Sequence, residues 1–420
     1  MPNVNDLTLY QASAVLIDLI KQATGKEVLN PASPGEFTSV ATTALKTAAD
    51  PIMNALSQMW GRTIFAVRPY REKFASLFMD MDRWANVTRK ISFADKDIKD
   101  DERFIWPCGY DAAQAVPNGD GSSVDMYKIN KDDPLQTNFY GQSVYQDVRT
   151  EFLSGLETAF RSPDEFMRYN AAAVLSRANK LAQYRENIGR AITINLIGSL
   201  YFIANSLAPL GDSSRVIHLV TEYNTELGLT GDDALTSQTV MQPDNYAAFT
   251  RWVYARIGNL VDLMSERSTM YQTTINGKVI NRHTGAEDIR IFILSKYLRQ
   301  MDSMAKSVTF HDDLLKLGEV ESVAFWQDIK SPDCVDLANT ISLTGADGSV
   351  ITSALAAGST ALPNVYGVIF DRDALGYAPT REASYVTPFN AAGEYWNQFV
   401  HVNFRTVQDT TEKSVLLMLD

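Results

Sequence analysis

"GVIFDRDALGYAPTREASYVTPFNAAGEYWNQFVHVNFRT", residues 367–406, holds three patterns in succession. A short apolar strand comes first and breaks at Asp371-Arg372-Asp373. An aromatic-rich stretch follows, and the segment ends in a long run whose side chains alternate between two faces, as in a half-buried strand. We therefore expect this segment to be tied into a sheet, and we ask whether its Asp-Arg-Asp cluster carries chemistry.

The last strand of this segment has two unlike faces. One face is mostly apolar and is predicted to pack on a long helix; it holds Trp396, Gln398, Val400, Val402 and Phe404. The other face is mixed, as expected where a strand meets solvent or a neighbour; it holds Tyr395, Asn397, Phe399, His401 and Asn403. The following run "KSVLLML", residues 413–419, is predicted to return as the antiparallel partner of this strand.

The Asp371-Arg372-Asp373 cluster has two interpretations. Paired carboxylates can divide acid and base roles when their environments separate their pKa values. Arg372, however, favours ionisation of both carboxylates. Asp373 also precedes "ALGY" as an N-cap precedes a short helical turn. These features favour a turn between two lobes over an active site.

The clearest single element is a helix that begins near residue 163. Ser162 is a suitable N-cap, Pro163 suits the first helical position, and Glu165 completes a capping box. An apolar stripe of sevenfold spacing follows and predicts a helix to at least Gly189, about 40 Å long at ~1.5 Å per residue. A coiled-coil seam is the alternative, but the pattern does not persist for enough heptads.

Residues 82–103, "DRWANVTRKISFADKDIKDDER", are dense in charge yet neutral overall. Residues 87–93 alternate with a strand period, strong turn signals follow, and a second extended piece covers residues 137–148. The pattern predicts a long two-stranded ribbon, which is marginal alone in water and needs a surface to lie on. A solvated hairpin over its own domain is the alternative.

The remaining patterns predict a mixture of helices and strands. Residues 1–30 favour a helical arm that ends at Gly25, and Asp50-Pro51 divides a second helical stretch at residues 37–60. Residues 243–267 show the spacing of an amphipathic helix. Residues 288–298 favour a strand that opens into a helix, and further short strands are expected at 321–326 and 365–370. This order indicates an α+β fold.

Composition excludes several classes of function. The chain has 420 residues and a formal net charge of −12, with no basic arm, so direct binding of DNA or RNA is not expected. Cys108 and Cys334 are too few for a disulfide framework. The N-terminus lacks the basic start of a signal peptide. The most apolar window, residues 191–204, is shorter than the ~20 residues of a membrane span and is predicted to be buried core.

No motif for enzymatic chemistry or cofactor binding is found. The four histidines and two cysteines lack zinc-site spacing, and no nucleotide-binding or nucleophile-elbow motif occurs. His311-Asp312-Asp313 is the best metal candidate, but Asp at a helix N-terminus explains it better. We therefore predict no catalytic residue, no cofactor and no metal.

The order of these pieces resembles the major capsid proteins of tailed bacteriophages, which have the Hong Kong 97 fold. The resemblance is most specific at Gly393, Tyr395, Trp396 and Asn397, where a Gly-x-Tyr-Trp-Asn stretch leads into the last strands. A weaker match is "FIWPCGYDAA", residues 104–113. The chain is most similar to the major head proteins of small short-tailed podophages.

The resemblance implies a division into four parts: an N-terminal arm (1–60), an extended loop (82–145), a peripheral domain with the long spine helix and strands (61–81, 146–204, 241–275 and 383–420), and an axial domain (205–240 and 276–382). It also implies pentamers and hexamers of an icosahedral shell around double-stranded DNA, in the virion. The implied partners are copies of the chain and scaffolding, portal and other head proteins, with no specific DNA binding and no membrane.

The charged ribbon is the predicted subunit interface. Many modest ion pairs, each worth ~0–1 kcal/mol when exposed, can set orientation and register on a neighbour. The candidate interface residues are Arg83, Arg89, Lys90, Asp97, Lys99, Asp101, Arg103 and Trp106. Two alternatives stay open at this point: an encapsulin-type cellular nanocompartment shell, and a soluble hydrolase that uses distant carboxylates.

Overall fold

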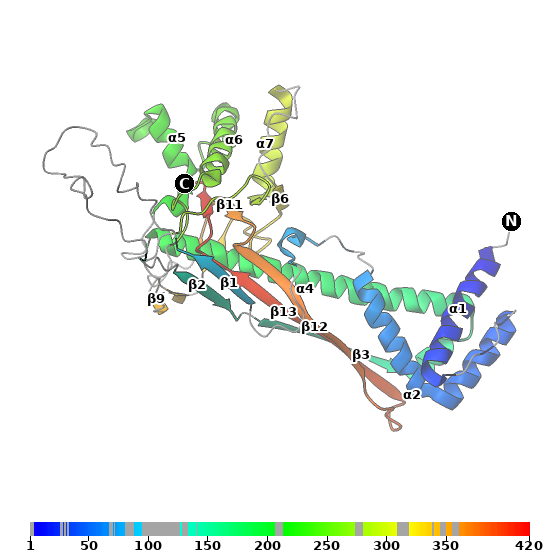
Figure 1. Ribbon diagram of the computed structural model, residues 1–420. Coiled ribbons are helices and arrows are strands. Elements are labelled where there is room, and N and C mark those ends of the chain that lie inside the picture. The colour runs from blue at the N-terminus through cyan, green and yellow to red at the C-terminus, as the bar shows by residue number, and fades with distance from the viewer. Residues whose placement is uncertain are drawn as a thin grey trace.

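The computed structural model describes residues 4–25, 28, 31, 33–66, 70, 72–79, 88–94, 127, 133–140, 142–205, 213–273, 280–308, 319–337, 340–344, 350–354 and 361–420. This part of the chain is elongated around one long helix. Several helices and a mixed sheet gather at one end, and two N-terminal helices lie at the other (Figure 1). Helices and strands alternate along the chain, which confirms the α+β class.

The long helix, α4 (Pro163–Asn205), is the axis of the molecule. Its 43 residues span about 65 Å at ~1.5 Å per residue. It begins where the Ser-Pro-Asp-Glu signal predicts and continues 16 residues beyond Gly189, the predicted minimum. The extension is the apolar window 191–204, whose side chains include the buried Leu196, Ile197 and Leu200. The prediction that this window is core is confirmed.

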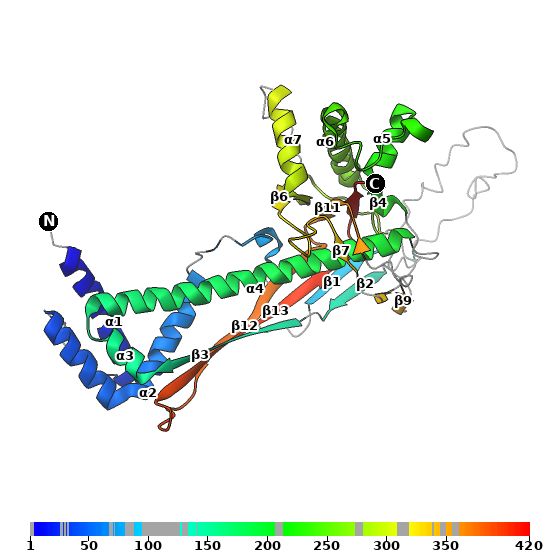
Figure 2. The ribbon, with the colours of Figure 1, turned by 180° about the vertical axis from the view of Figure 1, so that it is seen from behind.

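A three-stranded antiparallel sheet lies along α4 (Figure 2). Its order is β12 (Leu375–Val386), β13 (Tyr395–Gln408) and β3 (Gln142–Phe152). All five residues of the predicted inner face of β13 are buried, and Gln398 accepts a hydrogen bond from Arg177 of α4. The assignment of the two faces of this strand is therefore confirmed.

The predicted partner of this strand is wrong. Residues 413–419 contain β14 (Ser414–Met418), which joins a different, five-stranded sheet of order β4-β14-β11-β5-β6. There β14 runs antiparallel to β11 (Val365–Asp371) and parallel to β4 (Val216–His218). Both edges of β13 are already taken by β12 and β3, and every residue of β14 is buried. A continuous apolar run suits the middle of a sheet that is covered on both faces.

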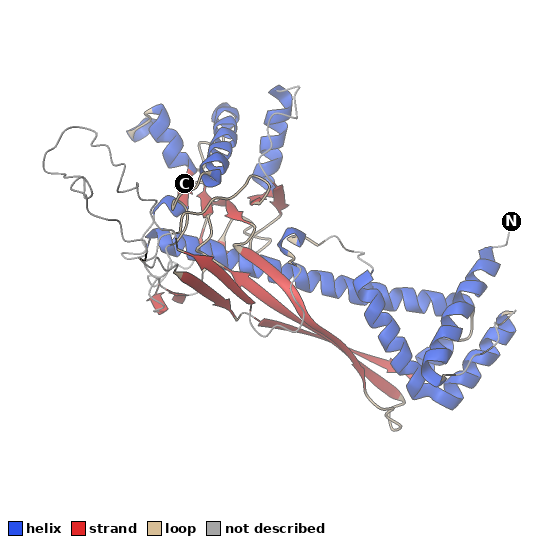
Figure 3. Ribbon diagram, viewed as in Figure 1, coloured by secondary structure: helices blue, strands red, loops and turns tan. Residues whose placement is uncertain are grey.

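Helices gather around the five-stranded sheet, whose other members are β5 (Ile289–Leu294) and β6 (Glu319–Val323). The helices are α5 (Leu219–Leu227), α6 (Pro243–Ser265) and α7 (Ser295–Val308), and α6 packs against both of the others (Figure 3). The predicted helix at 243–267 and the predicted strand-to-helix passage at 288–298 are both confirmed.

The N-terminal arm packs at the far end of α4. It comprises α1 (Val4–Thr24) and α2 (Pro34–Ala66), and the short α3 (Leu153–Ala159) lies beside them. Gly25 ends α1 with φ +68, a left-handed conformation that favours glycine. Ala48 is non-helical just before Pro51, so α2 is kinked near the predicted division. Buried side chains of both helices form a second apolar cluster with the start of α4 and Trp396.

The described part of the ribbon is one antiparallel pair of strands. β1 (Thr88–Phe93) pairs antiparallel with β2 (Pro134–Phe139). The second extended piece, residues 137–148, is divided between β2 and β3. Short elements complete the described residues: three 3-10 turns at Ala75–Leu77, Ser213–Arg215 and Gly231–Asp233, and the strand pairs β7 (Val335–Asp336) with β10 (Ala361–Leu362) and β8 (Thr340–Thr344) with β9 (Val350–Ala354). Among the described helices, none is both long and apolar enough to cross a membrane.

Candidate subunit interface

Strand β1 of the ribbon turns its large apolar side chains outward. Along β1, Ile91 is 57% exposed and Phe93 is 61% exposed, and Arg89 points the same way. Lys90 lies on the opposite face, against its own chain. A strand on the surface of a lone subunit normally places its apolar side inward. Strand β1 has the reverse arrangement, whereas its partner β2 buries Leu135.

Strand β3 shows the same reversal. Val144, Val148 and Phe152 are exposed, each by about half of their surface. The intervening Asp147 and Glu151 point inward to α4. Burial of a charged side chain costs desolvation free energy unless the charge is paired. Groups on α4 therefore have to pair with Asp147 and Glu151.

The inward charges of β3 are paired with α4. Asp147 accepts a hydrogen bond of 3.0 Å from Lys180, and Glu151 accepts one from the hydroxyl of Tyr169. Burial, with the bond to Glu151, raises the pKa of Tyr169 well above its ordinary value, so the hydroxyl keeps its proton and donates. The polar side of β3 is therefore held on the helix, and its apolar side faces away.

The outer face of the whole three-stranded sheet is nearly free of charge. Strand register places Val148 beside Phe399, and Phe399 beside Tyr385, while the rings of Phe152 and Tyr395 lie 5.9 Å apart. The outward side chains of the three strands are Val144, Gln146, Val148, Thr150 and Phe152 of β3, Tyr395, Asn397, Phe399, His401 and Asn403 of β13, and Arg381, Ala383 and Tyr385 of β12. We call this set the outer sheet face. This face is mixed, as predicted for β13, and its exposed apolar side chains are typical of an interaction surface.

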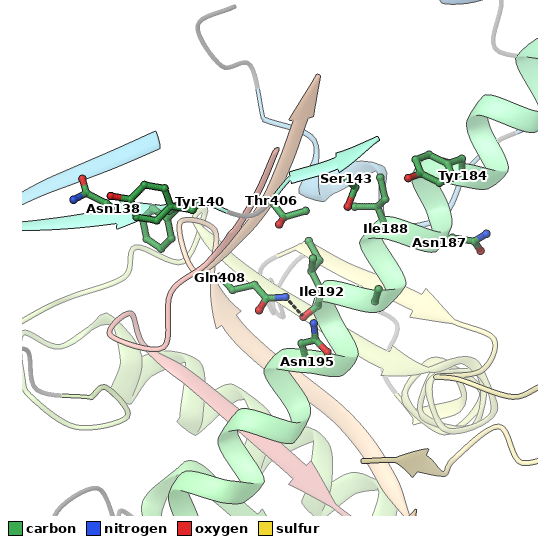
Figure 4. Close-up of a pocket in the computed structure, with 12 residues that line it drawn as sticks. Asn138, Tyr140, Ser143, Tyr184, Asn187, Ile188, Ile192, Asn195, Thr406 and Gln408 are labelled. Atoms are coloured by element: carbon green, nitrogen blue, oxygen red, sulfur yellow. Dashed lines mark hydrogen bonds between the residues drawn. The ribbon is translucent and has the colours of Figure 1, made fainter. Parts of the chain in front are cut away.

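Among the described residues, no charged side chain lines the pocket at the base of the ribbon. It has a volume of about 550 Å³ and lies between β2, α4 and the end of β13 (Figure 4). Gln408 reaches across it and donates a 3.5 Å hydrogen bond to the carbonyl oxygen of Ile192. Its other polar lining consists of amides and hydroxyls such as Asn187 and Tyr184. The lining that the structure describes therefore includes no carboxylate, imidazole or amine for acid–base catalysis.

The Asp-Arg-Asp cluster forms the turn from β11 to β12, which carries the chain from one sheet to the other. Asp371 accepts hydrogen bonds from the Thr284 hydroxyl at 2.5 Å and from the Asp373 backbone N–H at 2.8 Å. Both carboxylate oxygens of Asp371 are thus used to shape the turn. The interpretation of the cluster as a turn between lobes is confirmed.

The structure describes two of the eight predicted interface residues. Arg89 is exposed beside Ile91 and Phe93, whereas Lys90 is paired within its own chain. The other six, Arg83, Asp97, Lys99, Asp101, Arg103 and Trp106, lie outside the described residues, as does His311-Asp312-Asp313. Within the described residues, no group of three His, Cys, Asp or Glu side chains could hold a metal ion.

The exposed apolar residues were missed by sequence reasoning. The alternation along residues 87–93 was visible, but the high charge density directed attention to the charged side chains. A signal that could have found some of them is an apolar residue with a charged neighbour on the opposite face, as in Val148 next to Asp147 and Arg149, or Phe152 next to Glu151.

Comparison with known proteins identifies the family. The sequence profile described as Phi29-like phage major capsid protein matches residues 20–418. The chain belongs to this family. It is thus a major capsid protein, a subunit of the icosahedral shell of a phage and a component of the virion capsid. The family is one of structural proteins, and neither the encapsulin-type shell nor the hydrolase is favoured.

Solved structures support the fold. The chain is similar to a chain in the capsid structure of Staphylococcus phage Andhra, with a TM-score of 0.52 and 12% identity, over 83% of this chain and 84% of that chain. It is also similar to a chain in a structure of native bacteriophage P68, with a TM-score of 0.47 and 11% identity, over 81% and 83% of the two chains. The likeness to the Andhra capsid shows the Hong Kong 97-type fold, as predicted. No significant match is found among curated proteins.

Proposed function

We propose that this major capsid protein assembles into hexamers and pentamers by laying the ribbon of one subunit on the outer sheet face of the next. The observation that carries this proposal is the arrangement of β1 and β3, which both turn large apolar residues outward and place Lys90, Asp147 and Glu151 inward. Burial of two such faces against each other removes apolar area from water on both subunits. The two faces differ, so the contact is heterologous, and such a contact forms a ring where the rotation between successive subunits closes.

The charged residues of the ribbon act at the margin of this contact. Arg89 lies next to the apolar pair Ile91 and Phe93, and an exposed ion pair there is worth ~0–1 kcal/mol. Charges in such positions orient the encounter and set register more than they add affinity. The remaining ribbon charges, Arg83, Asp97, Lys99, Asp101 and Arg103, and the indole of Trp106, are proposed to act in the same way.

The four-part division carries over with adjusted boundaries. We assign residues 1–60 to the arm, 82–141 to the extended loop, and α4 with the three-stranded sheet, which takes in residues 142–145 and 375–382, to the peripheral domain. Two elements that the sequence placed in the peripheral domain, α6 and β14, join the axial domain because they pack with α7 and pair with β11. The axial domain then surrounds the symmetry axis of each ring.

The shell encloses double-stranded DNA without specific binding. A net charge of −12 disfavours tight binding to DNA phosphates, and weak binding suits a shell that encloses a polyanion. Scaffolding, portal and other head proteins are proposed as further partners. We propose no catalytic residue, metal or cofactor.

The test is Val148→Arg, which places a charge in the middle of the outer sheet face. Val148 is about half exposed, so the unfolding free energy should change by less than about 0.5 kcal/mol. Ring and shell formation, followed by sedimentation velocity and electron microscopy, should be lost. Asn179→Arg adds the same charge on an exposed position of α4 and should assemble normally. Normal shells from Val148→Arg would overturn the proposed contact.

A further inference from the structure

The base of the ribbon is joined to its own subunit by a group of charges. Nζ of Lys90, on the inward face of β1, lies 3.3 Å from Oδ2 of Asp409 and also pairs with Glu412. Glu412 pairs in addition with Arg282. Two carboxylates therefore meet two cations, and only Lys90 comes from the ribbon.

Both carboxylates belong to the link between the two sheets. Asp409 and Glu412 lie between the end of β13 and the start of β14, and their side chains are 2% and 6% exposed. Asp409 is fixed there, because Oδ1 accepts hydrogen bonds from the backbone N–H of Thr411 at 2.9 Å and from its hydroxyl at 2.5 Å. The ribbon thus docks on a rigid point at which the peripheral and axial parts of the chain join.

If the ribbon moved away from its subunit, this group of four charges would lose one of its two cations. Without Lys90, the two buried carboxylates would share Arg282 alone, and a buried charge left without its partner is strongly destabilising. Burial lowers the pKa of Lys90, and the Asp409 carboxylate opposes that shift. The ribbon is therefore favoured in one position by a contact that is directional and shielded from water.

We propose that Lys90 is a positioning residue, an anchor that holds the ribbon on the junction between the two sheets and so sets the angle at which Ile91 and Phe93 face a second copy of the chain. The proposal rests on the proposed function, because it specifies what orients the ribbon for the contact between subunits. It separates Lys90 from the other candidate interface residues: Lys90 acts within the subunit and Arg89 between subunits.

The design of β1 supplies a matched test. Lys90→Met keeps an unbranched side chain of nearly the same length and removes its charge. Lys90→Arg keeps the charge, and Arg89→Met removes a charge from the opposite face of the same strand. Hydrogen exchange of the amides of residues 88–93 and 134–139 is measured on the full, unassembled chain isolated by size exclusion. We expect exchange about tenfold faster in Lys90→Met, because the ribbon opens more often once a partly buried ion pair is lost. Lys90→Arg and Arg89→Met should exchange as the unaltered chain does.

Equal exchange in Lys90→Met and Arg89→Met would overturn the anchor. The double variant Lys90→Met with Glu412→Gln guards against a general loss of stability, because it restores the charge balance of the buried group. It should recover the melting temperature while ribbon exchange stays fast. If the double variant also recovers slow exchange, Lys90 serves charge balance and the anchor is rejected.

The two proposals are tested separately. Ribbon exchange is measured before any assembly, so its result does not depend on whether Val148→Arg forms shells. An anchored ribbon combined with normal shells from Val148→Arg would reject the interface and keep the anchor. Loss of shells in Val148→Arg with unchanged exchange in Lys90→Met would do the opposite.

Discussion

His218 and Asp420 form a pH-sensitive contact at the edge of the five-stranded sheet. Nδ1 of His218 lies 2.7 Å from Oδ1 of Asp420, at the point where β4 leads into α5. The hydrogen bond to Asp420 is the main cause that raises the pKa of His218, burial opposes it, and the charges of Asp420 and Glu222 add to it. A raised pKa in the folded state means that the charged imidazole stabilises the fold.

The contact predicts that stability declines as the pH rises. The contribution of His218 is fully present below its unfolded pKa, about 6.5, and is lost as the pH passes through the higher folded value. Nuclear magnetic resonance titration of the unassembled chain should give a His218 pKa above 6.5 that falls toward 6.5 in Asp420→Asn. A His218 that titrates at or below its ordinary value in the unaltered chain would contradict this prediction.

Single residues also show the limit of what sequence patterns can predict. The two faces of β13 were predictable, because five alternating positions include Trp396, Val402 and Phe404 on one side. The role of Lys90 was not, because its partners Asp409 and Glu412 lie more than 300 residues away along the chain. A local pattern shows that a strand has two faces, but it does not show which face meets the rest of the molecule.

Among the elements, α4 depends on a close contact at Gly189. A Cβ at this position would lie 2.6 Å from the Cβ of Phe74, which is fully buried. Alanine normally favours a helix over glycine by about 1 kcal/mol, but overpacking costs about 1–3 kcal/mol. Because Phe74 is held in the core, we expect Gly189→Ala to lower the unfolding free energy by roughly 1–2 kcal/mol, as measured by urea denaturation.

Gly155 of α3 is the control for this prediction. It is also helical, but a Cβ there meets nothing within 4 Å. Gly155→Ala should therefore show the ordinary helix preference and gain up to about 1 kcal/mol. If both alanine variants gained stability equally, the contact between α4 and Phe74 would not limit helix packing.

The elements differ in how well they could be predicted, for physical reasons. The start of α4 was predictable because Ser162 and Pro163 are local capping signals that do not depend on distant contacts. Its end was not, because the apolar window 191–204 lacks a cap and fits a buried helix or a buried strand equally well. The predicted partner of β14 was wrong because β13 is its nearest strand in the sequence. In the structure β14 instead pairs with β11 and β4, which are distant in the sequence.

On the scale of the whole molecule, the ribbon should be separable from the fold. The structure limits the deletion to residues 88–139, because residues 142–145 already pair with β13. The deletion removes Lys90, so it should be combined with Glu412→Gln to keep the buried group balanced. Circular dichroism should show a folded chain with a cooperative thermal transition, while sedimentation velocity should show only monomer.

Two outcomes would count against this prediction. Assembly of the deleted chain into normal rings would show that the ribbon is dispensable for subunit contact. Loss of the cooperative transition, with Glu412→Gln alone remaining folded, would show that the ribbon is part of the core of the subunit. The Glu412→Gln chain with an intact ribbon is the matched control.

The place of β14 links the fold to the order in which the chain is synthesised. This strand joins β4 to β11 in the five-stranded sheet, although about 200 residues separate it from β4. Until Met418 has left the ribosome, β4 has no partner among the described strands, and β11 presents an open edge. An open, apolar edge is a template for aggregation. A translation product interrupted before Ser414 therefore lacks the strand that joins β4 to β11, and this lobe stays incomplete.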